Sequence, residues 1–440
     1  MALGGGTWIT QNKKLPGAYI NFVSSRNANA TLSERGIVAM PITIGWGVDD
    51  EVFELTNEDF QKNSLKLLGY SIDATELAPL RELFLNAKKA YLYKVNTGGA
   101  KAENTYCTAK YKGTRGNQIK TVILADETST VSNPVYVVQT YFANILVDEQ
   151  KAITEIAGLV ANDYCTWKTS ATLEVTAGVS CTGGTDGEAT AASYQAFLTA
   201  IESYSFNVIG YAGTTSSIKA LFATWTKRMR DEIGLKFQLV LHQYTTADHE
   251  GIISVENNLI GETDPTGKLV YWVAGAEAGC EVNKSLSNTA YNGELNINVA
   301  YSQTQLETML TAGKFVFHKV NDTIRVLSDI NTFTTTTDEK GTDFSKNQVI
   351  RVLDQIGNDV ANIFNTKYLG KIPNDASGRI SLWNDIVKHH QELERLRAIE
   401  DFSADNVVVD KGDTKEAVVI TDNITPICAM EKLYMTIVVA

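Results

Sequence analysis

Hydrophobic and polar residues alternate near both ends of the chain. Near the start, the two faces of residues 17–23 are Ala18, Ile20 and Phe22 against Tyr19, Asn21 and Val23. Near the end, the two faces are Leu433, Met435, Ile437 and Val439 against Lys432, Tyr434 and Thr436. This period of two predicts a β-strand at each end. An apolar strand without a partner is a template for another chain, so each strand either pairs within its own chain or joins the sheet of a neighbouring subunit.

Residues 28–99 carry strand patterns at both ends and helix patterns between them. The run 36–47 is an apolar strand bounded by glycines, and residues 90–95 form a second strand. Between these strands, one helix starts after the cap candidates Thr56 and Asn57, and another starts near Pro79. We therefore predict a βααβ unit.

Residues 100–180 differ from the preceding segment, because Thr and Val become abundant and turn residues recur. Short strands are predicted at 105–111, 118–124, 135–141, 144–147 and 172–176, and helical periodicity is confined to 150–161. Several short strands at this spacing indicate a small β-sandwich-like module.

From residue 183 onward, helix and strand patterns alternate. Helices are predicted at 189–204, 215–233 and 302–312, and strands at 206–209, 237–241, 269–273, 314–318 and 323–327. This alternation is typical of a mainly parallel sheet with helices on both faces. The last part of the chain has amphipathic helices at 344–364 and 380–402, followed by a strand at 417–421.

Composition excludes several classes of partner. The 440 residues carry a formal net charge of −12, which argues against a nucleic-acid or anionic-membrane partner, because both require a basic face. No apolar run approaches the length that spans a bilayer. The five cysteines form no CxxC pair, which favours reduced thiols over a disulfide framework or a zinc site. We expect a protein that is made in the cytoplasm and stays there until lysis.

Two groups of residues could bind a ligand, and a structural explanation is favoured for each. The glycine-rich loop 183–187 could cradle a phosphate before a helix, but it lacks the P-loop lysine and the GxGxxG spacing, so we expect a tight turn. His242, Asp248, His249 and Glu250 could bind a metal or transfer protons, but they follow no known ligand spacing. We expect them to form a polar or inter-subunit surface.

No motif in the sequence indicates an enzyme. His389 and His390 lie on the seam of the last helix, where we expect one of them to pack or to form a hydrogen bond. No GxSxG elbow is present, and no serine lies in a recognisable strand-to-helix context with a partner His and Asp. No catalytic residue, cofactor or metal is therefore predicted.

Several segments, in this order along the chain, resemble contractile tail sheath proteins of phages and of phage-tail-like bacteriocins. They are residues 183–187 (GGTDG), 271–279 (YWVAGAEAG), 314–320 (KFVFHKV), 324–332 (IRVLSDINT), the helix 349–364 and the ending 430–440. The ending is most similar to sheaths of prophages of Gram-positive bacteria. The resemblance covers essentially the whole chain.

The resemblance implies an α/β multi-domain protein with a subtilisin-like α/β core, a β-sandwich-like insert, an α+β C-terminal domain and terminal strand arms. The parts expected are an N-terminal arm (1–27), an N-terminal α/β segment (28–99), a β-rich domain (100–180), the core (181–335), the C-terminal domain (336–425) and a C-terminal arm strand (426–440). No Asp, His and Ser triad is evident where that core would need one, so we expect no proteolysis.

The resemblance also implies how the protein works. Many copies would polymerise helically around a tail tube protein, with baseplate and tail terminator proteins as further partners, and each arm would be inserted beside a neighbour's strands. The particle would assemble in the bacterial host cytoplasm and then form the tail of a released virion or bacteriocin. A helix of the C-terminal domain would touch the tube, and we nominate Lys388, Arg395 and Arg397 for this contact.

Two other classes of function stay open from the residues alone. Another self-assembling structural protein, such as a tube or surface-layer subunit, would also use strand exchange. A degenerate subtilisin-like hydrolase would need a serine with a histidine nearby.

Overall fold

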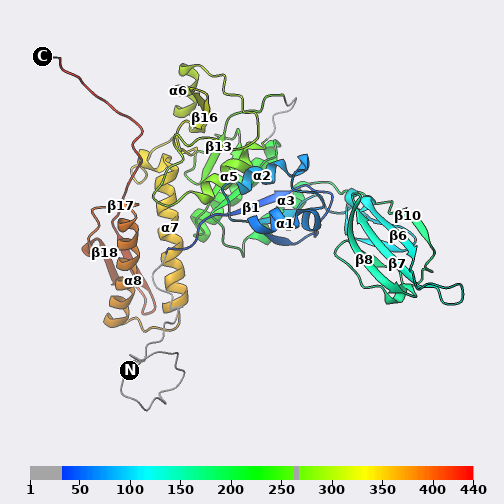
Figure 1. Ribbon diagram of the computed structural model, residues 1–440. Coiled ribbons are helices and arrows are strands. Elements are labelled where there is room, and N and C mark those ends of the chain that lie inside the picture. Colours follow the sequence, from blue (N-terminus) through cyan, green and yellow to red (C-terminus); the bar gives the residue numbers. More distant parts are fainter. Residues whose placement is uncertain (1–31, 262–266, 440) are drawn as a thin grey trace, which may run out of the picture.

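The computed structural model describes residues 32–261 and 267–439. Figure 1 shows a central sheet with helices around it, a β-rich module on one side, and the long helices α7 (Asn347–Ile363) and α8 (Ala376–Arg395) on the other. The predicted α/β multi-domain class is confirmed. The predicted strand at residues 17–23 lies outside the described residues.

The central sheet has seven strands in the order β14-β13-β12-β11-β1-β3-β2, and all neighbours are parallel except β2 and β3. Its strands are β1 (Ile37–Ile42), β2 (Val52–Thr56), β3 (Lys89–Lys94), β11 (Val208–Tyr211), β12 (Gln238–His242), β13 (Ile252–Val255) and β14 (Lys314–Phe315). The segments 28–99 and 181–335 thus build one sheet together. The inner strands β1, β11, β12 and β13 are buried on both faces, as parallel strands usually are.

Helices cover both faces of this sheet, as the alternating pattern predicted. One face packs against α1 (Asn57–Leu68), α2 (Ala78–Phe84) and α5 (Leu269–Gly279). The other packs against α3 (Ala191–Ile201) and α4 (Ser216–Lys227), and α4 continues as a π-helix, η4 (Arg228–Ile233). Helix α6 (Gln303–Thr311) buries none of its residues.

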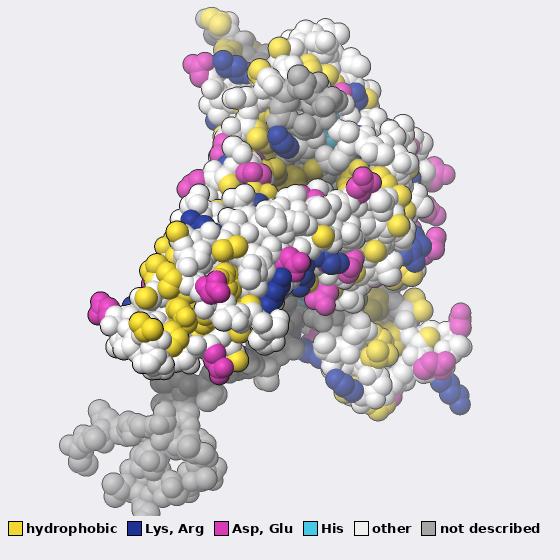
Figure 2. All heavy atoms as spheres, turned by 90° about the vertical axis from the view of Figure 1, so that its right-hand side faces the viewer, with side chains coloured by type: hydrophobic (Ala, Val, Ile, Leu, Met, Phe, Trp, Pro, Cys, Tyr) yellow, Lys and Arg dark blue, Asp and Glu magenta, His cyan; other side chains and the backbone are white. Residues whose placement is uncertain are grey.

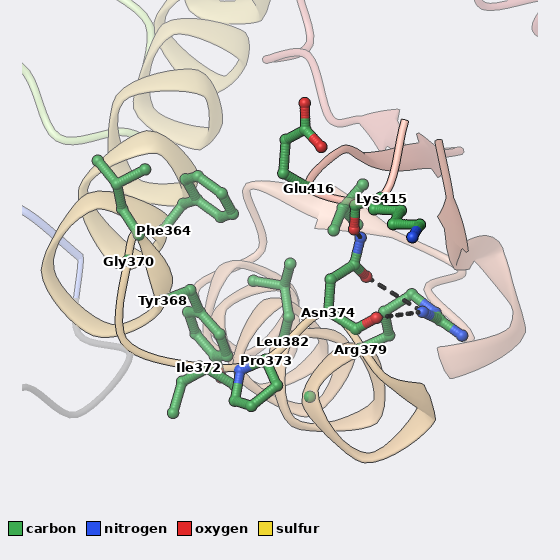
Figure 3. A pocket seen from close by; sticks show the side chains of 13 residues that line it. Phe364, Tyr368, Gly370, Ile372, Pro373, Asn374, Arg379, Leu382, Lys415 and Glu416 are labelled. Atoms are coloured by element: carbon green, nitrogen blue, oxygen red, sulfur yellow. Dashed lines mark hydrogen bonds between the residues drawn. The ribbon is translucent and has the colours of Figure 1, made fainter. Parts of the chain in front are cut away.

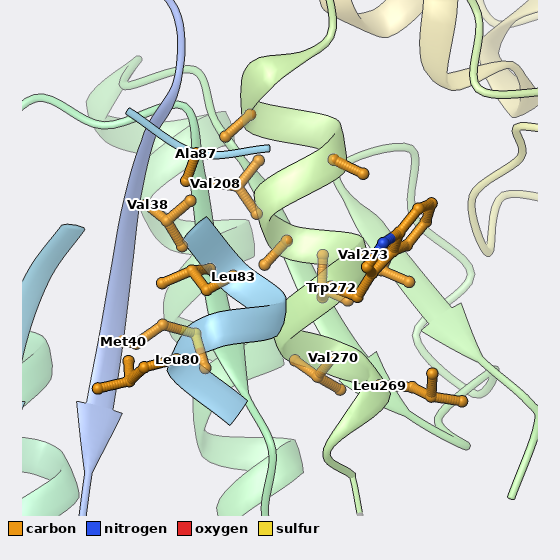
Figure 4. Close-up of a cluster of buried hydrophobic side chains, with 14 of the residues drawn as sticks. Val38, Met40, Leu80, Leu83, Ala87, Val208, Leu269, Val270, Trp272 and Val273 are labelled. Carbon is orange, nitrogen blue, oxygen red and sulfur yellow. The ribbon is translucent and has the colours of Figure 1, made fainter. Parts of the chain in front are cut away.

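The predicted strand at 269–273 is wrong, because these residues form the first turns of α5. A short, wholly apolar run does not reveal its period, since a buried strand and a buried helix look alike in sequence. Helix α5 is buried nearly all round and lies against β1, β11 and α2 (Figure 4). Gly275 and Gly279 allow this approach, because a Cβ on either would overlap the backbone carbonyls of Leu83 and Asn86.

The β-rich module contains two antiparallel sheets that share a core. One sheet has the order β10 (Thr176–Ser180), β6 (Ile119–Ala125), β7 (Tyr136–Phe142), β8 (Ile145–Ile153). The other has the order β4 (Lys101–Glu103), β5 (Cys107–Lys112), β9 (Cys165–Trp167). Two local predictions are wrong here. Residues 150–161 are not a helix, because β8 continues to Ile153 and only the turn η3 (Ile156–Gly158) follows, and the strand predicted at 172–176 begins at Thr176.

The C-terminal part packs the apolar face of α7 against α8, through residues such as Ile356, Ile363, Leu382 and Leu393. Helix α8 starts at Ala376, where Asp375 caps it, and ends at Arg395, so the predicted extension to 402 is wrong. Its remaining elements are β17 (Ile399–Glu400), β18 (Val407–Lys411), β19 (Val418–Asp422) and β20 (Thr425–Pro426).

Smaller elements complete the chain. The hairpin β15 (Phe317–Val320) and β16 (Thr323–Val326) follows the central sheet, as predicted. The short helical turns are η1 (Thr75–Leu77), η2 (Thr114–Gln118), η5 (Thr342–Ser345), η6 (Phe364–Tyr368) and η7 (Ala404–Asn406). No helix of the described ranges is long and apolar enough to cross a bilayer.

We expect Gly275→Ala to lower the free energy of unfolding by about 1–3 kcal/mol, because the new methyl group would push α5 away from the backbone of α2. Thermal and urea unfolding would measure this loss. Gly341→Ala is the matched control, since nothing lies within 4 Å of a Cβ built there. Equal stability of the two variants would contradict the packing described for α5.

Candidate inter-subunit site

The chain leaves the folded body after β20 and runs outward as an extended tail, residues 427–439 (Figure 1). The side chains on its predicted apolar face are largely exposed: Leu433 86%, Met435 70%, Ile437 73% and Val439 90%. Pairing of the C-terminal strand within its own chain, one of the two possibilities left open by the sequence, does not occur among the described residues. A contiguous exposed apolar segment marks an interaction site.

Polar contacts fix the root of this tail on the body. The amide of Ile427 donates to the carbonyl of Ala398 (3.0 Å), and the amide of Ala429 donates to Gln348 Oε1 (2.9 Å). Glu431 then accepts hydrogen bonds from Lys346 Nζ at 2.6 Å and Ser287 Oγ at 2.5 Å. Among the described residues, the hydrogen bonds between tail and body end at Glu431. The eight residues 432–439 are therefore free to contact another molecule.

The hairpin β18–β19 is a two-stranded sheet whose outer edges have no strand partner among the described residues. Its inner face, with Val407, Val409 and Ile420, packs in the cluster formed by α7 and α8. Its outer face exposes Val408 and Val419, at 44% and 53%. The hairpin is therefore held in place on one face and open at both edges.

An apolar groove of about 400 Å³ lies beside this hairpin (Figure 3). Its floor comes from η6, the loop after η6 and the start of α8, with Phe364, Tyr368, Ile372 and Leu382. Polar groups on its rim include Arg379, which donates to Asn374 Oδ1 at 3.1 Å. The groove offers space for apolar side chains next to a free strand edge.

Helix α7 joins this C-terminal part to the central sheet through buried charges. Arg351 Nη2 contacts Glu277 Oε2 of α5 at 2.5 Å and Asp329 Oδ2 at 3.2 Å, and all three side chains are about 0–1% exposed. Arg230 of η4 forms two hydrogen bonds to Asp354, at 2.7 and 2.8 Å. The sequence predicted the apolar stripe of α7 and missed this polar face, because polar residues at helical spacing usually indicate a solvated face.

These buried charges strongly affect one another. Burial raises the pKa of Glu277 well above its usual value, and the neighbouring Asp329 adds to the effect against the opposing charge of Arg351. Burial would also raise the pKa of Asp329, but the charge of Arg351 and several hydrogen bonds hold it below its usual value. Removing one partner of such a buried pair typically costs about 3–5 kcal/mol. The contacts therefore make α7 part of the same rigid body as the sheet.

The residues that the sequence analysis considered as possible ligand sites have structural roles. In the loop 183–187, the Asp186 carboxylate accepts hydrogen bonds from the Thr114 amide (2.9 Å) and hydroxyl (2.7 Å). A Cβ on Gly187 would overlap the carbonyl of Thr97. The next helix, α3, is closed by a capping box of Thr190 and Ser193. The expected tight turn is wrong, because Thr182 and Thr185 form antiparallel bridges with Glu103 and Ala100 in an extended segment. This segment fastens the β-rich module to the central sheet.

His242 and His249 are buried, so the expected polar or inter-subunit surface is wrong. His249 lies with Asp231 and Glu250 close enough for a metal ion. However, His249 Nδ1 accepts from the Gly251 amide (3.0 Å), so Nε2 carries the proton and donates it to Asp231 (3.1 Å). No lone pair of His249 then points at a metal, and Glu250 is already paired with Lys340 (2.7 Å). The arrangement is a buried polar cluster.

His389 and His390 are both buried and form hydrogen bonds to carboxylates, so the prediction for the last helix is confirmed. Among the described residues, none of the histidine hydrogen bonds reaches a serine or cysteine side chain. A nucleophile, histidine and acid triad is not assembled in this part of the chain.

Comparison with known proteins gives the family. Models of the phage tail sheath protein central domain, the phage tail sheath C-terminal domain and the tail sheath protein Gp18 domain III N-terminal region match residues 187–332, 339–440 and 35–95. The phage-like element PBSX protein XkdK of Bacillus subtilis is 31% identical over 99% of both chains. The chain belongs to the phage tail sheath family. The resemblance drawn from the sequence is thereby confirmed, and the protein is a structural subunit of a contractile sheath.

Solved structures agree with this assignment. The sheath tail protein of Desulfitobacterium hafniense is 36% identical, with a TM-score of 0.81 over 95% of this chain and 99% of that chain. The sheath tail protein of Listeria innocua is 30% identical, with a TM-score of 0.78 over 92% and 95%. The contracted helical sheath of the anti-feeding prophage is 13% identical with a TM-score of 0.59 over 97% and 99%, and shares the fold.

The charge distribution of the sheath subunit agrees with its composition. Figure 2 shows basic and acidic side chains scattered over one face, without a continuous basic field there. Lys388, Arg395 and Arg397, nominated for tube contact, are exposed at and after the end of α8. Arg395 is paired with Glu392 (2.5 Å), whereas the described residues contain no ion pair of Lys388 or Arg397.

We expect the tail root of the sheath subunit to loosen in acid. Burial alone would raise the pKa of Glu431, but the hydrogen bonds from Lys346 and Ser287 hold it below its usual value. A lowered carboxyl pKa stabilises the contact above the unfolded value and loses that stabilisation as pH falls through the folded value. Hydrogen exchange of residues 427–431 should therefore accelerate, beyond its intrinsic pH dependence, below about pH 4.5.

Glu431→Gln should exchange rapidly at neutral pH and lose this acid response, because it lacks the charge that binds Lys346. Glu188→Gln, at an exposed carboxylate, is the control and should behave like the parent chain. An unchanged acid response in Glu431→Gln would show that another group fixes the tail root.

Proposed function

We propose that the sheath subunit polymerises helically around a tail tube by giving its terminal strands to neighbouring copies, and that the polymer contracts to drive the tube through a cell envelope. The observation that carries this proposal is the exposed tail, whose apolar face has no strand partner among the described residues. Burying a Leu, Ile or Met side chain contributes about 1.5–3 kcal/mol. Burial of four apolar side chains on one face would therefore strongly favour binding of the strand to a neighbouring copy.

The acceptor in this proposal is the hairpin β18–β19 of a neighbouring copy, together with its groove. An added strand would continue the hydrogen-bonded ladder at a free edge, and its apolar face would turn toward the groove beside Phe364 and Leu382. A slip of one residue would turn this face to water, so alternation fixes the register. The predicted N-terminal strand, with Ala18, Tyr19, Ile20, Phe22 and Val23, would use the other edge in the same way.

Contraction would be possible because each subunit has a rigid body and is linked to its neighbours by exchanged strands. The buried charges along α7 keep the sheet and the C-terminal helices together, while exchanged strands stay bonded as the bodies change neighbours. The free energy would be stored at assembly, so no nucleotide or other cofactor is required. Solved relatives of the same fold include sheaths described as contracted and one described within a baseplate structure.

The proposed partners are further copies of the chain, a tail tube protein, and baseplate and tail terminator proteins. The subunit would act as a structural protein without enzymatic activity, first in the host cytoplasm and then in a released tail. A subtilisin-like fold of the core remains part of this proposal. The alternatives, another tube or surface-layer subunit and a degenerate hydrolase, have no observation that favours them over a sheath.

The tail strand can be tested face by face. Leu433→Ser with Ile437→Ser should abolish sheath-like tubes in electron micrographs, because two buried apolar contacts per subunit are lost. The matched variant, Tyr434→Ser with Thr436→Ser, changes the opposite face and should still polymerise. A chain lacking residues 433–440 keeps the root contacts of Glu431, and tubes formed by that chain would refute strand donation.

The tube contact can be tested by reversing charge at the positions without ion pairs. Lys388→Glu with Arg397→Glu should leave polymerisation intact but lower the fraction of sheaths that contain a tube, because the sign of the surface charge is reversed. Lys284→Glu with Lys319→Glu, at two exposed positions of the central part, is the control, since it adds the same charge elsewhere. Counting filled and empty sheaths after co-assembly measures the effect, and equal fractions would remove α8 from the tube interface.

A further inference from the structure

Two adjacent histidines of α8 face each other inside the C-terminal part. His389 Nδ1 lies 3.1 Å from His390 Nδ1, and both side chains are 0% exposed. The other nitrogen of each ring contacts a carboxylate: His389 Nε2 lies 2.9 Å from Asp359 of α7, and His390 Nε2 lies 2.6 Å from Asp422 of β19. Four titratable side chains thus form one continuous chain of hydrogen bonds.

Counting hydrogens shows that this chain of hydrogen bonds needs one more proton than two neutral imidazole rings carry. An ionised carboxylate only accepts, so each Nε2 must hold a hydrogen. A neutral imidazole has a single N–H, and both Nδ1 atoms would then be bare, with two lone pairs facing each other at 3.1 Å. One proton placed between the two Nδ1 atoms turns this repulsion into a charge-assisted hydrogen bond.

We propose that His389 and His390 share one extra proton, and that this proton clamp fixes the hairpin β18–β19 to α8 and to the root of the N-terminal segment. On one side, Asp422 ends β19 and pairs with Val407 of β18. On the other, Asp359 accepts from the amide of Ser33 at 3.3 Å, at the start of the described chain. The clamp joins elements that are about 320 residues apart in sequence.

The surroundings of the pair favour a single positive charge. Burial would raise the pKa of Asp359, but hydrogen bonds from His389, Ser33 and Gln355 hold it below its usual value, so this carboxylate is ionised. The second facing carboxylate is Asp422 of β19. The ring of Phe402, from the segment after β17, packs on His390 with centroids 5.3 Å apart. On α8 itself, the adjacent Lys388 is exposed.

The clamp should hold the hairpin firmly only within a limited range of pH. In alkali, loss of the shared proton leaves two bare nitrogens opposed, and in acid a second proton puts two N–H groups head to head. The hairpin should loosen on both sides of the window. If the hairpin accepts strands from neighbours, which rests on the proposed function, assembly should also weaken outside this window.

Nitrogen NMR of the assembled full-length protein, labelled with ¹⁵N in its five histidines, tests the shared proton directly. At neutral pH we expect one ring protonated on both nitrogens and a neighbouring ring protonated on Nε2 alone, with a correlation between the two Nδ1 atoms. Two neutral Nε2–H rings or two cationic rings would overturn the clamp. So would Nδ1 signals that change on adding a chelator, since a metal ion would then occupy the gap.

A variant tests the consequence. In His389→Gln the side-chain amide can still donate to Asp359, but no Nδ1 opposes His390, so the alkaline loosening should disappear. Hydrogen exchange of residues 407–422, corrected for the intrinsic rate, should rise about tenfold from neutral to alkaline pH in the parent chain and remain nearly constant in the variant. His318→Gln is the control and should keep the parent profile. Identical profiles of His389→Gln and the parent would overturn the clamp.

The two proposals fail in different ways. A shared proton with hairpin loosening but unaltered tube formation would support the clamp and refute the hairpin as acceptor. Tubes that depend on the tail face, in a protein whose histidine rings are both neutral, would keep the proposed function and overturn the clamp.

Discussion

Charges buried between α7 and the central sheet tie together segments that are distant in the chain. The guanidinium of Arg351 meets carboxylates from α5 and from the segment after β16, and Arg230 meets Asp354. A charge taken out of water must keep its partner, because an unpaired buried ion costs several kcal/mol. The C-terminal helices therefore cannot swing away from the sheet without breaking these pairs. Among the described residues, the β-rich module is fastened to this body through the segment 182–187, and residues 432–439 extend from the body as a tail.

This stiffness suits the use that we propose for the free segments. An exchanged strand is held by backbone hydrogen bonds that run along one edge, and it stays paired while the bodies on either side rotate. A flexible body would absorb such a movement internally instead of passing it to its neighbours. The residues 432–439 add an apolar face that needs a partner, while Glu431 fixes the point from which the strand departs. In the proposed mechanism, the rigid body and the exchanged strand thus divide the mechanical work of the sheath.

Sequence patterns located most elements where periodicity was unambiguous. The start of α1 follows from its cap at Thr56, and the parallel sheet follows from alternation of helix and strand. The pattern failed where the environment, not the local sequence, sets the conformation. The run from Leu269 is helical because it fills the space between β1 and α2, and the segment after Gln150 stays extended because β7 pairs with it.

The sequence by itself determined the apolar alternation of the tail, the lack of a catalytic motif and the likeness to tail sheaths, because these depend on residue type and order. The tertiary structure decided what the polar residues do. Spacing cannot tell a solvated helix face from one docked on buried partners, so the roles of Arg351, His389 and His390 appeared only when distant segments were brought together. It also decided that the C-terminal strand pairs with no strand of ranges 32–261 and 267–439, since pairing is a long-range property that no local pattern contains.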